Sequence, residues 1–296
     1  MNLFNVAIIG AGPAGIAAAL QLNRMGITAL LFEKNQPGGL LLNANLVENY
    51  PGLKHPLSGP QLAEIFKDQL AKTDTKVIPA RVLALDYSEN AFSIKTRDNM
   101  YRAHTALIAS GTTARKIPEL KISTGANSKM LSEIFPILHC SDQDIVIIGA
   151  GDAAFDYALN MARKNRVEIL NRTAQRKCLS LLFKRALSND NISYSDNTRV
   201  IRATLTPENK LMLEIQMADK INQFECDYLV TAIGREPSLD FVVESMKLQM
   251  QELQDKGILC LAGDVKNGHY RQALIAAGEG IRAAMMIAEE LQGKLN

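Results

Sequence analysis

The chain alternates short apolar, β-branched runs with longer stretches whose apolar residues recur at helical spacing. Two of these runs, Val6–Ile9 and Ile145–Ile148, are each followed by a glycine-rich turn and then by an alanine-rich stretch. Runs of this length predict buried parallel strands, and the alanine-rich stretches predict helices. The repeated order of strand, turn and helix predicts an α/β fold built from two similar units.

The first glycine turn reads GAGPAG, Gly10–Gly15. In such a turn Gly10 permits the tight bend, Gly12 lets the backbone approach a pyrophosphate, and Gly15 allows the helix to pack closely on the strand. The next predicted strand ends at Glu33, about twenty residues after the turn, where a carboxylate binds ribose hydroxyls. This combination predicts a dinucleotide that contains adenosine.

The second turn reads GAGDAA, Gly149–Ala154, with alanine in the third glycine position. The strand that follows it ends without a carboxylate and is succeeded by Arg172, Arg176 and Lys177. Basic residues at this position suit the 2′-phosphate of NADP, and so favour NADPH over NADH. A basic loop that is simply solvated remains an alternative interpretation.

The order of the predicted elements indicates that the second unit interrupts the first. We expect two Rossmann-like, three-layer dinucleotide-binding domains in an α/β fold, with residues 114–236 inserted between residues 1–113 and 237–296. Residues 112–118 are expected to form a linker. Further predicted elements are the strands Val77–Asp86, Ala91–Lys95, Ala103–Ala109, Tyr228–Ile233 and Ile258–Ala262, and a helix from about Tyr270 to Leu291.

Composition narrows the class of protein. The 296 residues are 47% hydrophobic, enough for two cores, and the net charge of +2 with mixed signs argues against nucleic acid as a partner. We find no leader peptide and no apolar stretch of membrane-spanning length, so the expectation is a soluble, cytoplasmic protein without a membrane partner. The cysteines form no C-x-x-C pair and no metal-ligand cluster; they are Cys140, Cys178, Cys226 and Cys260.

Several short motifs occur together in one order along the chain. They are GAGPAG at Gly10–Gly15, PGGLL at Pro37–Leu41, VENYPG at Val47–Gly52, ASG at Ala109–Gly111, GAGDAA at Gly149–Ala154, AIGR at Ala232–Arg235, AGDV at Ala262–Val265 and YRQA at Tyr270–Ala273. In this register the chain resembles, over nearly its whole length, the low-molecular-weight thioredoxin reductases and related flavoproteins. The resemblance implies FAD in the first and last segments, NADPH in the middle one, and a homodimer.

The resemblance and the glycine turns together give the candidate cofactor-binding residues. Those in the first and last segments are Gly10, Gly12, Pro13, Ala14, Gly15, Glu33, Lys34, Gly39, Leu40, Asn49, Val82, Ala109, Ser110, Gly111, Gly263, Asp264, Arg271, Gln272 and Ala273. Those in the middle segment are Gly149, Gly151, Asp152, Ala153, Arg172, Arg176, Lys177, Ile233, Gly234 and Arg235. The resemblance places Arg271–Ala273 at a helix N-terminus beside the flavin, where the helix dipole stabilises a reduced flavin. No residue is assigned a catalytic role, and none is assigned to a metal.

One segment departs from thioredoxin reductase. Counting back from Gly149, the two redox cysteines of that family fall on Ser132 and Phe135, and Cys140 alone cannot form an internal disulfide. Related bacillithiol disulfide reductases instead carry a cysteine in the first glycine turn, where this chain has Ala14. Ferredoxin–NADP reductases of the thioredoxin-reductase type also lack the pair, and they share the acid after the second turn, Asp152.

The sequence therefore predicts an FAD-dependent oxidoreductase that passes electrons from NAD(P)H through flavin directly to an external acceptor. Ferredoxin, flavodoxin or a small molecule would be that acceptor, rather than thioredoxin. Two alternatives stay open. Asn171 and Thr173, where the family has histidine and arginine, would suit an FAD protein that is reduced by a protein carrier and binds NADPH poorly. A regulatory flavoprotein without catalytic activity is the other.

Overall fold

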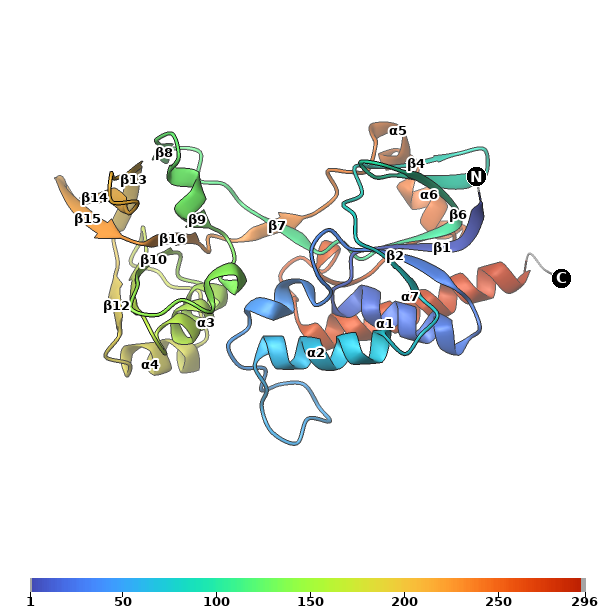
Figure 1. Ribbon diagram of the computed structural model, residues 1–296, viewed down its shortest axis with the longest axis horizontal. Coiled ribbons are helices and arrows are strands. Elements are labelled where there is room, and N and C mark those ends of the chain that lie inside the picture. The colour runs from blue at the N-terminus through green and yellow to red at the C-terminus, as the bar shows by residue number, and fades with distance from the viewer. Residues whose placement is uncertain (1, 294–296) are drawn as a thin grey trace. The chain divides into compact units, whose positions relative to one another are not determined.

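The computed structural model describes residues 2–293 and divides them into two compact units (Figure 1). Unit 1 contains the residues up to Leu42, Val47–Thr113 and the residues from Glu236 on. Unit 2 contains Asn43–Leu46 and Ala114–Arg235.

Unit 1 is built on a seven-stranded sheet. Its strands are β1 (Leu3–Ile9), β2 (Ala29–Phe32), β3 (Lys76–Ile78), β4 (Ala84–Ser88), β5 (Ala91–Lys95), β6 (Met100–Ile108) and β18 (Leu259–Leu261). Five of them are parallel in the order β3-β2-β1-β6-β18, and the antiparallel hairpin β4–β5 joins the first half of β6. Because β18 pairs with β6, the last strand of the chain completes a sheet that the first strand begins.

Helices cover both faces of this sheet. They are α1 (Pro13–Arg24), α2 (Gly59–Leu70), α5 (Glu244–Lys247), α6 (Met250–Asp255) and α7 (Ala273–Gly293), with the short 3₁₀ helices η1 (Gly39–Asn43) and η4 (Gly263–Val265). In Figure 1, α1, α2 and α7 lie below the strands of unit 1, α5 lies near the top of this unit, and α6 overlaps the region of β4 and β6 in this view. Met246 of α5 and Leu253 of α6 belong to one buried cluster with Ile9 and Phe32 of the sheet.

Unit 2 is built on a five-stranded parallel sheet of order β12-β11-β10-β16-β9. Its strands are β9 (Met130–Leu131), β10 (Asp144–Ile148), β11 (Arg166–Leu170), β12 (Ile192–Ser195) and β16 (Tyr228–Thr231). Its helices are α3 (Asp152–Met161), α4 (Ser180–Leu187), η2 (Ala126–Lys129) and η3 (Phe135–Ile137). A second sheet has the order β15-β14-β13-β8, from β8 (Lys121–Ile122), β13 (Thr198–Leu205), β14 (Leu211–Met217) and β15 (Lys220–Cys226).

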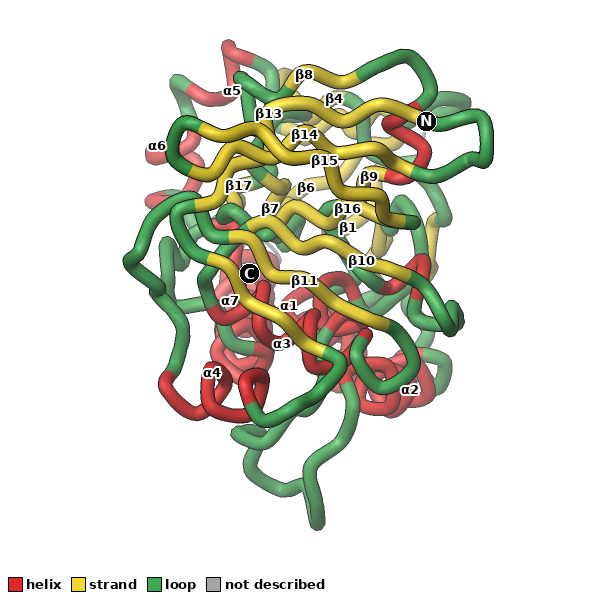
Figure 2. The backbone as a smooth tube through the Cα atoms, turned by 90° about the vertical axis from the view of Figure 1, so that its left-hand side faces the viewer, coloured by secondary structure: helices red, strands yellow, loops and turns green. Residues whose placement is uncertain are grey.

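Alternation along β10 explains the three layers of unit 2. Ile145 and Ile147 are buried with residues of α3 and α4, whereas Val146 and Ile148 are buried with residues of β13 and β14. Figure 2 shows the corresponding arrangement, with the helices on one side of the parallel strands and the second sheet on the other. A central strand that is apolar and buried from Ile145 to Ile148 therefore contributes to two cores at once. The predicted fold class, two Rossmann-like domains with the second inserted in the first, is confirmed.

The structure differs from the sequence predictions at two connections. Part of the expected linker 112–118 is a strand, β7 (Thr112–Ala114), which pairs with β17 (Arg235–Pro237). The backbone groups of β7 and β17 satisfy each other's hydrogen bonds at the two ends of the inserted segment. The expected strand Val77–Asp86 is interrupted after β3, because Pro79 cannot donate a ladder hydrogen bond.

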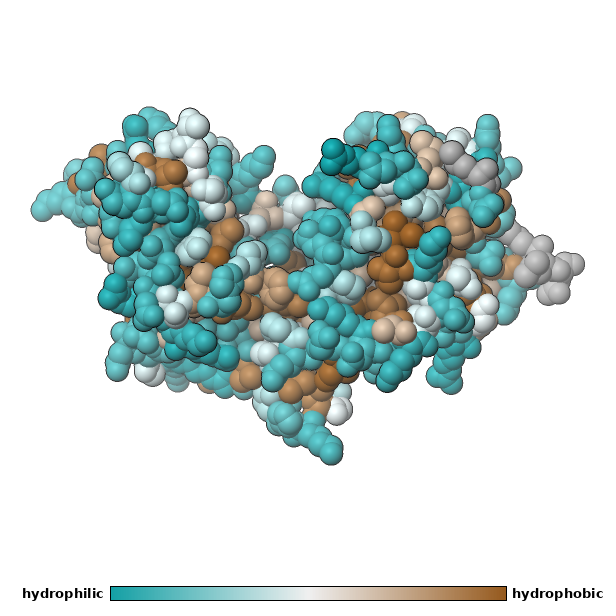
Figure 3. All heavy atoms as spheres, viewed as in Figure 1, coloured by the Kyte–Doolittle hydropathy of each residue, from teal (hydrophilic) through white to brown (hydrophobic). Residues whose placement is uncertain are grey.

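The surface is largely hydrophilic on the side that Figure 3 shows, with smaller apolar patches on each unit. Among residues 2–293, no helix combines the length and the apolar character that crossing a lipid bilayer requires.

Candidate functional site

The first glycine turn is packed so tightly from behind that two of its glycines leave no room for a side chain. Gly10 has a φ of +103°, and a Cβ there would lie 2.4 Å from the carbonyl oxygen of Ala109. A Cβ at Gly15 would lie 1.9 Å from the carbonyl oxygen of Gly10. A Cβ at Gly12, by contrast, would meet no heavy atom within 4 Å. Gly12 thus faces open space at the N-terminus of α1, where helix N–H groups favour an anion.

Glu33 lies beside this turn, directly after β2. Its carboxylate accepts hydrogen bonds from the backbone nitrogens of Ala11 and Asn35, each at 2.9 Å, and the residue is only 9% exposed. An ionised carboxylate can accept about four hydrogen bonds, so Glu33 keeps capacity for further donors. The backbone holds the carboxylate in one orientation before any ligand arrives.

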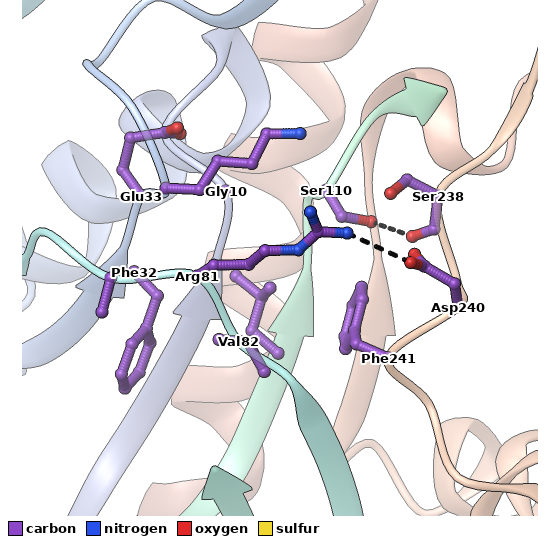
Figure 4. A pocket seen from close by; sticks show the side chains of 12 residues that line it. Gly10, Phe32, Glu33, Arg81, Val82, Ser110, Ser238, Asp240 and Phe241 are labelled. Carbon is purple, nitrogen blue, oxygen red and sulfur yellow. Dashed lines mark hydrogen bonds and ion pairs between the residues drawn. The ribbon is translucent and has the colours of Figure 1, made fainter. Parts of the chain in front are cut away.

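A pocket opens next to Glu33 at the carboxyl ends of β1 and β2 (Figure 4). It is lined by Ile9, Gly10, Phe32, Glu33, Lys34, Ala80, Arg81, Val82, Ser110, Ser238, Asp240 and Phe241. Sequence analysis singled out Gly10, Glu33, Lys34, Val82 and Ser110 from this set, and the fold brings them together. This is the edge of a parallel sheet at which nucleotides bind.

Sequence analysis did not single out the other seven residues of this lining, and four of them lie outside the strands: Arg81, Ser238, Asp240 and Phe241. They lie in connections that carry no recognisable motif, and three of them follow β17, far from the first glycine turn in the sequence. The Ser110 hydroxyl donates to the carbonyl oxygen of Ser238 at 2.6 Å, which ties the two segments together.

Two other predicted groups also meet inside unit 1. The Asn49 side-chain nitrogen donates to Oε1 of Gln272 at 3.0 Å, although the two residues are far apart in sequence. A Cβ at Gly39 would lie 3.2 Å from Cα of Gly12, so the PGGLL segment passes directly along the first glycine turn. Five further predicted residues lie at the ends of unit 1 elements: Leu40 in η1, Ala109 and Gly111 after β6, and Arg271 and Ala273 at the start of α7.

Glu279 is a second kind of omission from the sequence analysis. Its carboxylate on α7 accepts hydrogen bonds from the backbone nitrogen of Gly263 at 2.7 Å and from Nδ2 of Asn267 at 2.9 Å. Lys266 adds an ion pair at 3.7 Å. These contacts fix the turn η4 that carries Asp264, so Glu279 positions one of the predicted cofactor-binding residues.

The second glycine turn repeats the geometry of the first within unit 2. Gly149 has a φ of +140°, and a Cβ there would lie 2.4 Å from the carbonyl oxygen of Ala232. A Cβ at Gly151 would meet no heavy atom within 4 Å. Ala154, in the third position, is fully buried. The α3 N-terminus differs in one respect: exposed Asp152 stands in its first turn and accepts the backbone N–H of Leu179 at 2.7 Å.

The basic loop after β11 folds back onto this second turn. The Lys177 backbone nitrogen donates to the carbonyl oxygen of Ala150 at 2.8 Å. Buried Asn171 shapes the loop, because its side-chain nitrogen donates to the carbonyl oxygen of Gln175 and to the Tyr194 hydroxyl. Arg172 and Lys177 are exposed, and the Arg176 guanidinium lies 4.0 Å from the centre of the Phe183 ring.

An ion pair closes the other half of this sheet edge. A guanidinium nitrogen of Arg235, which follows β16, lies 3.1 Å from Oε1 of Glu133, which follows β9. Burial raises the pKa of the nearby Tyr157 phenol to about 12, and the neighbouring carboxylates Glu133 and Asp156 act in the same direction while Arg235 opposes them. Tyr157 therefore stays protonated at neutral pH. Gly234 and Ile233 precede Arg235 in the same connection.

The cysteines are expected to fall into two classes of reactivity. Burial raises the pKa of the Cys226 thiol to about 12 and that of Cys260 to about 11, and both residues are buried. Cys140 and Cys178 are half-buried, although burial also raises the pKa of the Cys178 thiol. Because the thiolate is the reactive form, an aromatic disulfide reagent at pH 8 should label two thiols in the native protein and four after denaturation. The matched variant Cys140→Ser should lower the native count by one. Rapid labelling of all four thiols in the native protein would contradict this expectation.

Comparisons with known proteins bear on both units together. The family model of the pyridine nucleotide-disulphide oxidoreductases matches residues 4–280. The chain belongs to this family. It is an NAD(P)H-dependent flavoprotein oxidoreductase of the thioredoxin reductase-like type.

Individual relatives of this oxidoreductase cover it almost completely. Thioredoxin reductase of Streptomyces clavuligerus is 30% identical over 95% of this chain and 92% of its own, and that of Chlamydia pneumoniae is 27% identical over 94% and 96%. Lactococcus lactis thioredoxin reductase, solved in a form called the FR conformation, has a TM-score of 0.85 at 23% identity, covering 98% of this chain and 99% of that one. At this level of sequence identity, the structural similarity supports the fold only.

These relatives overturn one prediction about this oxidoreductase. Direct transfer of electrons to ferredoxin, flavodoxin or another acceptor in place of thioredoxin is wrong, because the curated relatives that match nearly the whole chain are named thioredoxin reductases. The prediction depended on a single segment around Ser132 and Phe135. A likeness that extends along the entire chain outweighs it.

Proposed function

We propose that this chain holds FAD in unit 1 and NADPH in unit 2, and that a thioredoxin-type disulfide protein receives the electrons. One contrast carries the proposal. The two glycine turns have the same backbone geometry, yet a fixed carboxylate, Glu33, accompanies the first and exposed basic residues, Arg172 and Lys177, accompany the second. A carboxylate suits free ribose hydroxyls, and basic residues suit a 2′-phosphate.

The groups present in unit 1 fit FAD. Gly12 leaves an open cradle at a helix N-terminus for the pyrophosphate, and α1 has no acidic residue in its first turn. Glu33 would accept the ribose hydroxyls, and the pocket beside it would take the adenine. Asp264, held through Glu279, would lie at the ribityl phosphate, and the paired Asn49 and Gln272 along the flavin.

Bound FAD supplies the two-electron redox chemistry that connects a nicotinamide with a disulfide. The protein's own contribution is to bind and orient both dinucleotides. In unit 2 the ion pair between Arg235 and Glu133 lies at the carboxyl ends of β16 and β9, on the opposite side of β10 from the basic loop. The switch in strand order at β10 is where a dinucleotide crosses such a sheet, so we assign the nicotinamide half to this side.

Removing the basic side chains should change the choice of nucleotide. In the double variant Arg172→Ala, Lys177→Ala, the KM for NADPH should rise at least about tenfold, because two charge-assisted contacts to the 2′-phosphate are lost. The KM for NADH should change little. Both values can be obtained from the rate of anaerobic flavin bleaching.

Lys184→Ala is a suitable control, since this residue is basic and lies on α4 of the same unit beyond the loop. It should leave both constants as they are in the wild type. Equal losses for NADPH and NADH in the double variant would contradict the 2′-phosphate assignment and favour a solvated basic loop.

The segment at residues 132–135 bears on how electrons would reach the proposed acceptor. We propose that segment 132–135, which reads SEIF, lacks the internal dithiol, since its positions expected to hold cysteine are Ser132 and Phe135. All four cysteines of the chain are free thiols and lie far apart in sequence. Thioredoxin must then be reduced without two neighbouring cysteines in the reductase.

The decisive experiment combines an anaerobic spectrum with a thiol assay. Purified protein is titrated with NADPH while the oxidised-flavin absorbance is followed, and oxidised thioredoxin is then added and its new thiols are counted. Bleaching followed by thiol formation is the expected result. Bleaching without new thiols would exclude thioredoxin as the acceptor and leave the cofactor assignments intact. A flavin that dithionite bleaches but NADPH does not would overturn the NADPH site.

Cytoplasmic location and a homodimer stay predictions. Cell fractionation can test the first, and analytical sedimentation can test the second.

A further inference from the structure

An ion pair spans the pocket of unit 1, and the proposed function does not yet use it. A guanidinium nitrogen of Arg81, which follows β3, lies 3.3 Å from Oδ2 of Asp240, which follows β17. The two side chains are 61% and 63% exposed. Exposed pairs of this kind contribute about 0–1 kcal/mol to folding stability, so stability alone gives little reason for it.

The position of the Arg81 side chain is more informative than its ion pair. In Figure 4 it extends across the pocket, with Glu33 on one side and the side chains of Val82 and Phe241 on the other, and its tip meets Asp240. Val82 and Phe241 are 6% and 8% exposed and provide an apolar wall. The pocket therefore offers a carboxylate at one end, an apolar wall, and a planar cation at its rim.

This combination matches the adenosine half of a dinucleotide. The ribose presents hydroxyl donors, which suit the Glu33 carboxylate, and the adenine presents two flat faces. One face can lie on an apolar wall, and the other would be left to solvent unless the protein covers it. A guanidinium is planar, weakly hydrated and attracted to aromatic faces, so it covers a flat ring better than the compact, strongly hydrated ammonium of lysine does.

We propose that Arg81, oriented by Asp240, covers the outer face of the adenine ring of FAD and is a specificity determinant for the adenosine half of that cofactor. The inference rests on the proposed FAD site in unit 1. Asp240 belongs to the last third of the chain, so the pair joins that part of unit 1 to the adenosine that β1 and β2 hold at the other side of the pocket.

The test measures FAD binding to the full-length apoprotein, with flavin fluorescence as the signal. Arg81→Met keeps the apolar stem and removes the guanidinium, and we expect its Kd for FAD to rise roughly tenfold. AMP carries the adenine but no flavin. The Kd for AMP, calculated from its displacement of FAD and the Kd for FAD of the same variant, should therefore rise by a similar factor. Asp240→Asn should weaken FAD less, because the guanidinium remains but loses its orientation.

Two variants separate this role from simpler ones. Arg81→Lys keeps the charge without the plane, and it should resemble Arg81→Met. The matched control is Arg102→Met, which removes a comparable surface ion pair with Glu89 on the same sheet, away from the pocket lining. It should leave FAD affinity unchanged.

Wild-type affinity in Arg81→Met would overturn the inference. So would full rescue by Arg81→Lys, which would indicate attraction to phosphate, or a loss of FAD affinity without any loss of AMP affinity. These failures would leave the FAD site in place. If the wild-type apoprotein binds neither FAD nor AMP, the proposed function itself fails, and the measurement shows this directly.

Discussion

Replacing Gly280 by alanine should lower the free energy of unfolding by about 3 kcal/mol, the upper end for overpacking a buried contact. Gly280 lies on α7 against α1, and a Cβ there would lie 2.0 Å from the carbonyl oxygen of Ala14. The neighbour is backbone in the first turn of α1, so the clash can be relieved only by moving one helix away from the other. Urea unfolding followed by circular dichroism measures the change.

The same substitution should also reduce FAD content after purification, because α1 begins at the first glycine turn. A matched control is available two residues earlier on the same helix. A Cβ at Gly278 would meet nothing within 4 Å, and alanine is a better helix former than glycine, so Gly278→Ala should be neutral or stabilise by up to about 1 kcal/mol. Similar effects of the two substitutions would mean that the helix contact does not restrict this position.

The second large effect is expected from Glu33→Ala. We expect the Kd of the apoprotein for FAD to rise by at least about 100-fold, because charged hydrogen bonds to the ribose hydroxyls contribute about 1.5–3 kcal/mol each. The substitution also removes the hydrogen-bond acceptor of the Ala11 backbone N–H, which is buried beside the turn. Flavin absorbance per mole of purified protein and a fluorescence titration together give the result.

Glu64→Ala provides the control for the loss of a carboxylate. Glu64 lies on α2 of the same unit and makes an exposed ion pair with Lys67 at 3.2 Å. Its removal should leave FAD affinity unchanged. A Glu33→Ala protein that purifies with a full complement of FAD would show that Glu33 only organises the backbone of the turn.

Local chemistry made much of the fold predictable. Each glycine turn combines a short apolar run, fixed glycine spacing and an alanine-rich helix, and these signals agree within about fifteen residues. The structure adds the reason for the glycine spacing: Gly10 and Gly149 each lie against the carbonyl oxygen of the residue that directly follows a neighbouring parallel strand, Ala109 after β6 and Ala232 after β16. The insertion of one unit in the other could also be predicted, because the pattern of strand, glycine turn and helix occurs twice along the chain.

Contacts that depend on tertiary structure were beyond the reach of the sequence. Arg81 and Asp240 lie in connections of no particular composition, and only the folded sheet places them at one pocket. Nothing in the sequence distinguishes Glu279 from other helical acids. Its contact with the Gly263 backbone nitrogen depends on the packing of α7 beside η4. The pairing of β7 with β17 involves three residues from each segment, too few to show a period in the sequence.

The acceptor prediction went wrong for a different reason. The prediction was drawn from the short segment around Ser132 and Phe135, whereas the relatives named thioredoxin reductases match nearly the whole chain. Function depends on particular sites, so an unusual pair of residues in one segment does not by itself identify the electron acceptor of the whole protein.

The order in which the chain is assembled has a consequence for its synthesis. Unit 1 takes its first strand, β1, from the first residues of the sequence, and its last strand, β18, and covering helix, α7, from the last ones, so all of unit 2 lies between them in the sequence. A ribosome adds about 5–20 residues per second, so unit 2 emerges whole while α1 still lacks the helix that covers it. We expect the inserted unit to fold first, and a nascent chain stalled before α7 to expose the alanine-rich face of α1 to chaperones. The contact between α1 and α7 in unit 1 can therefore form only after unit 2 has been synthesised.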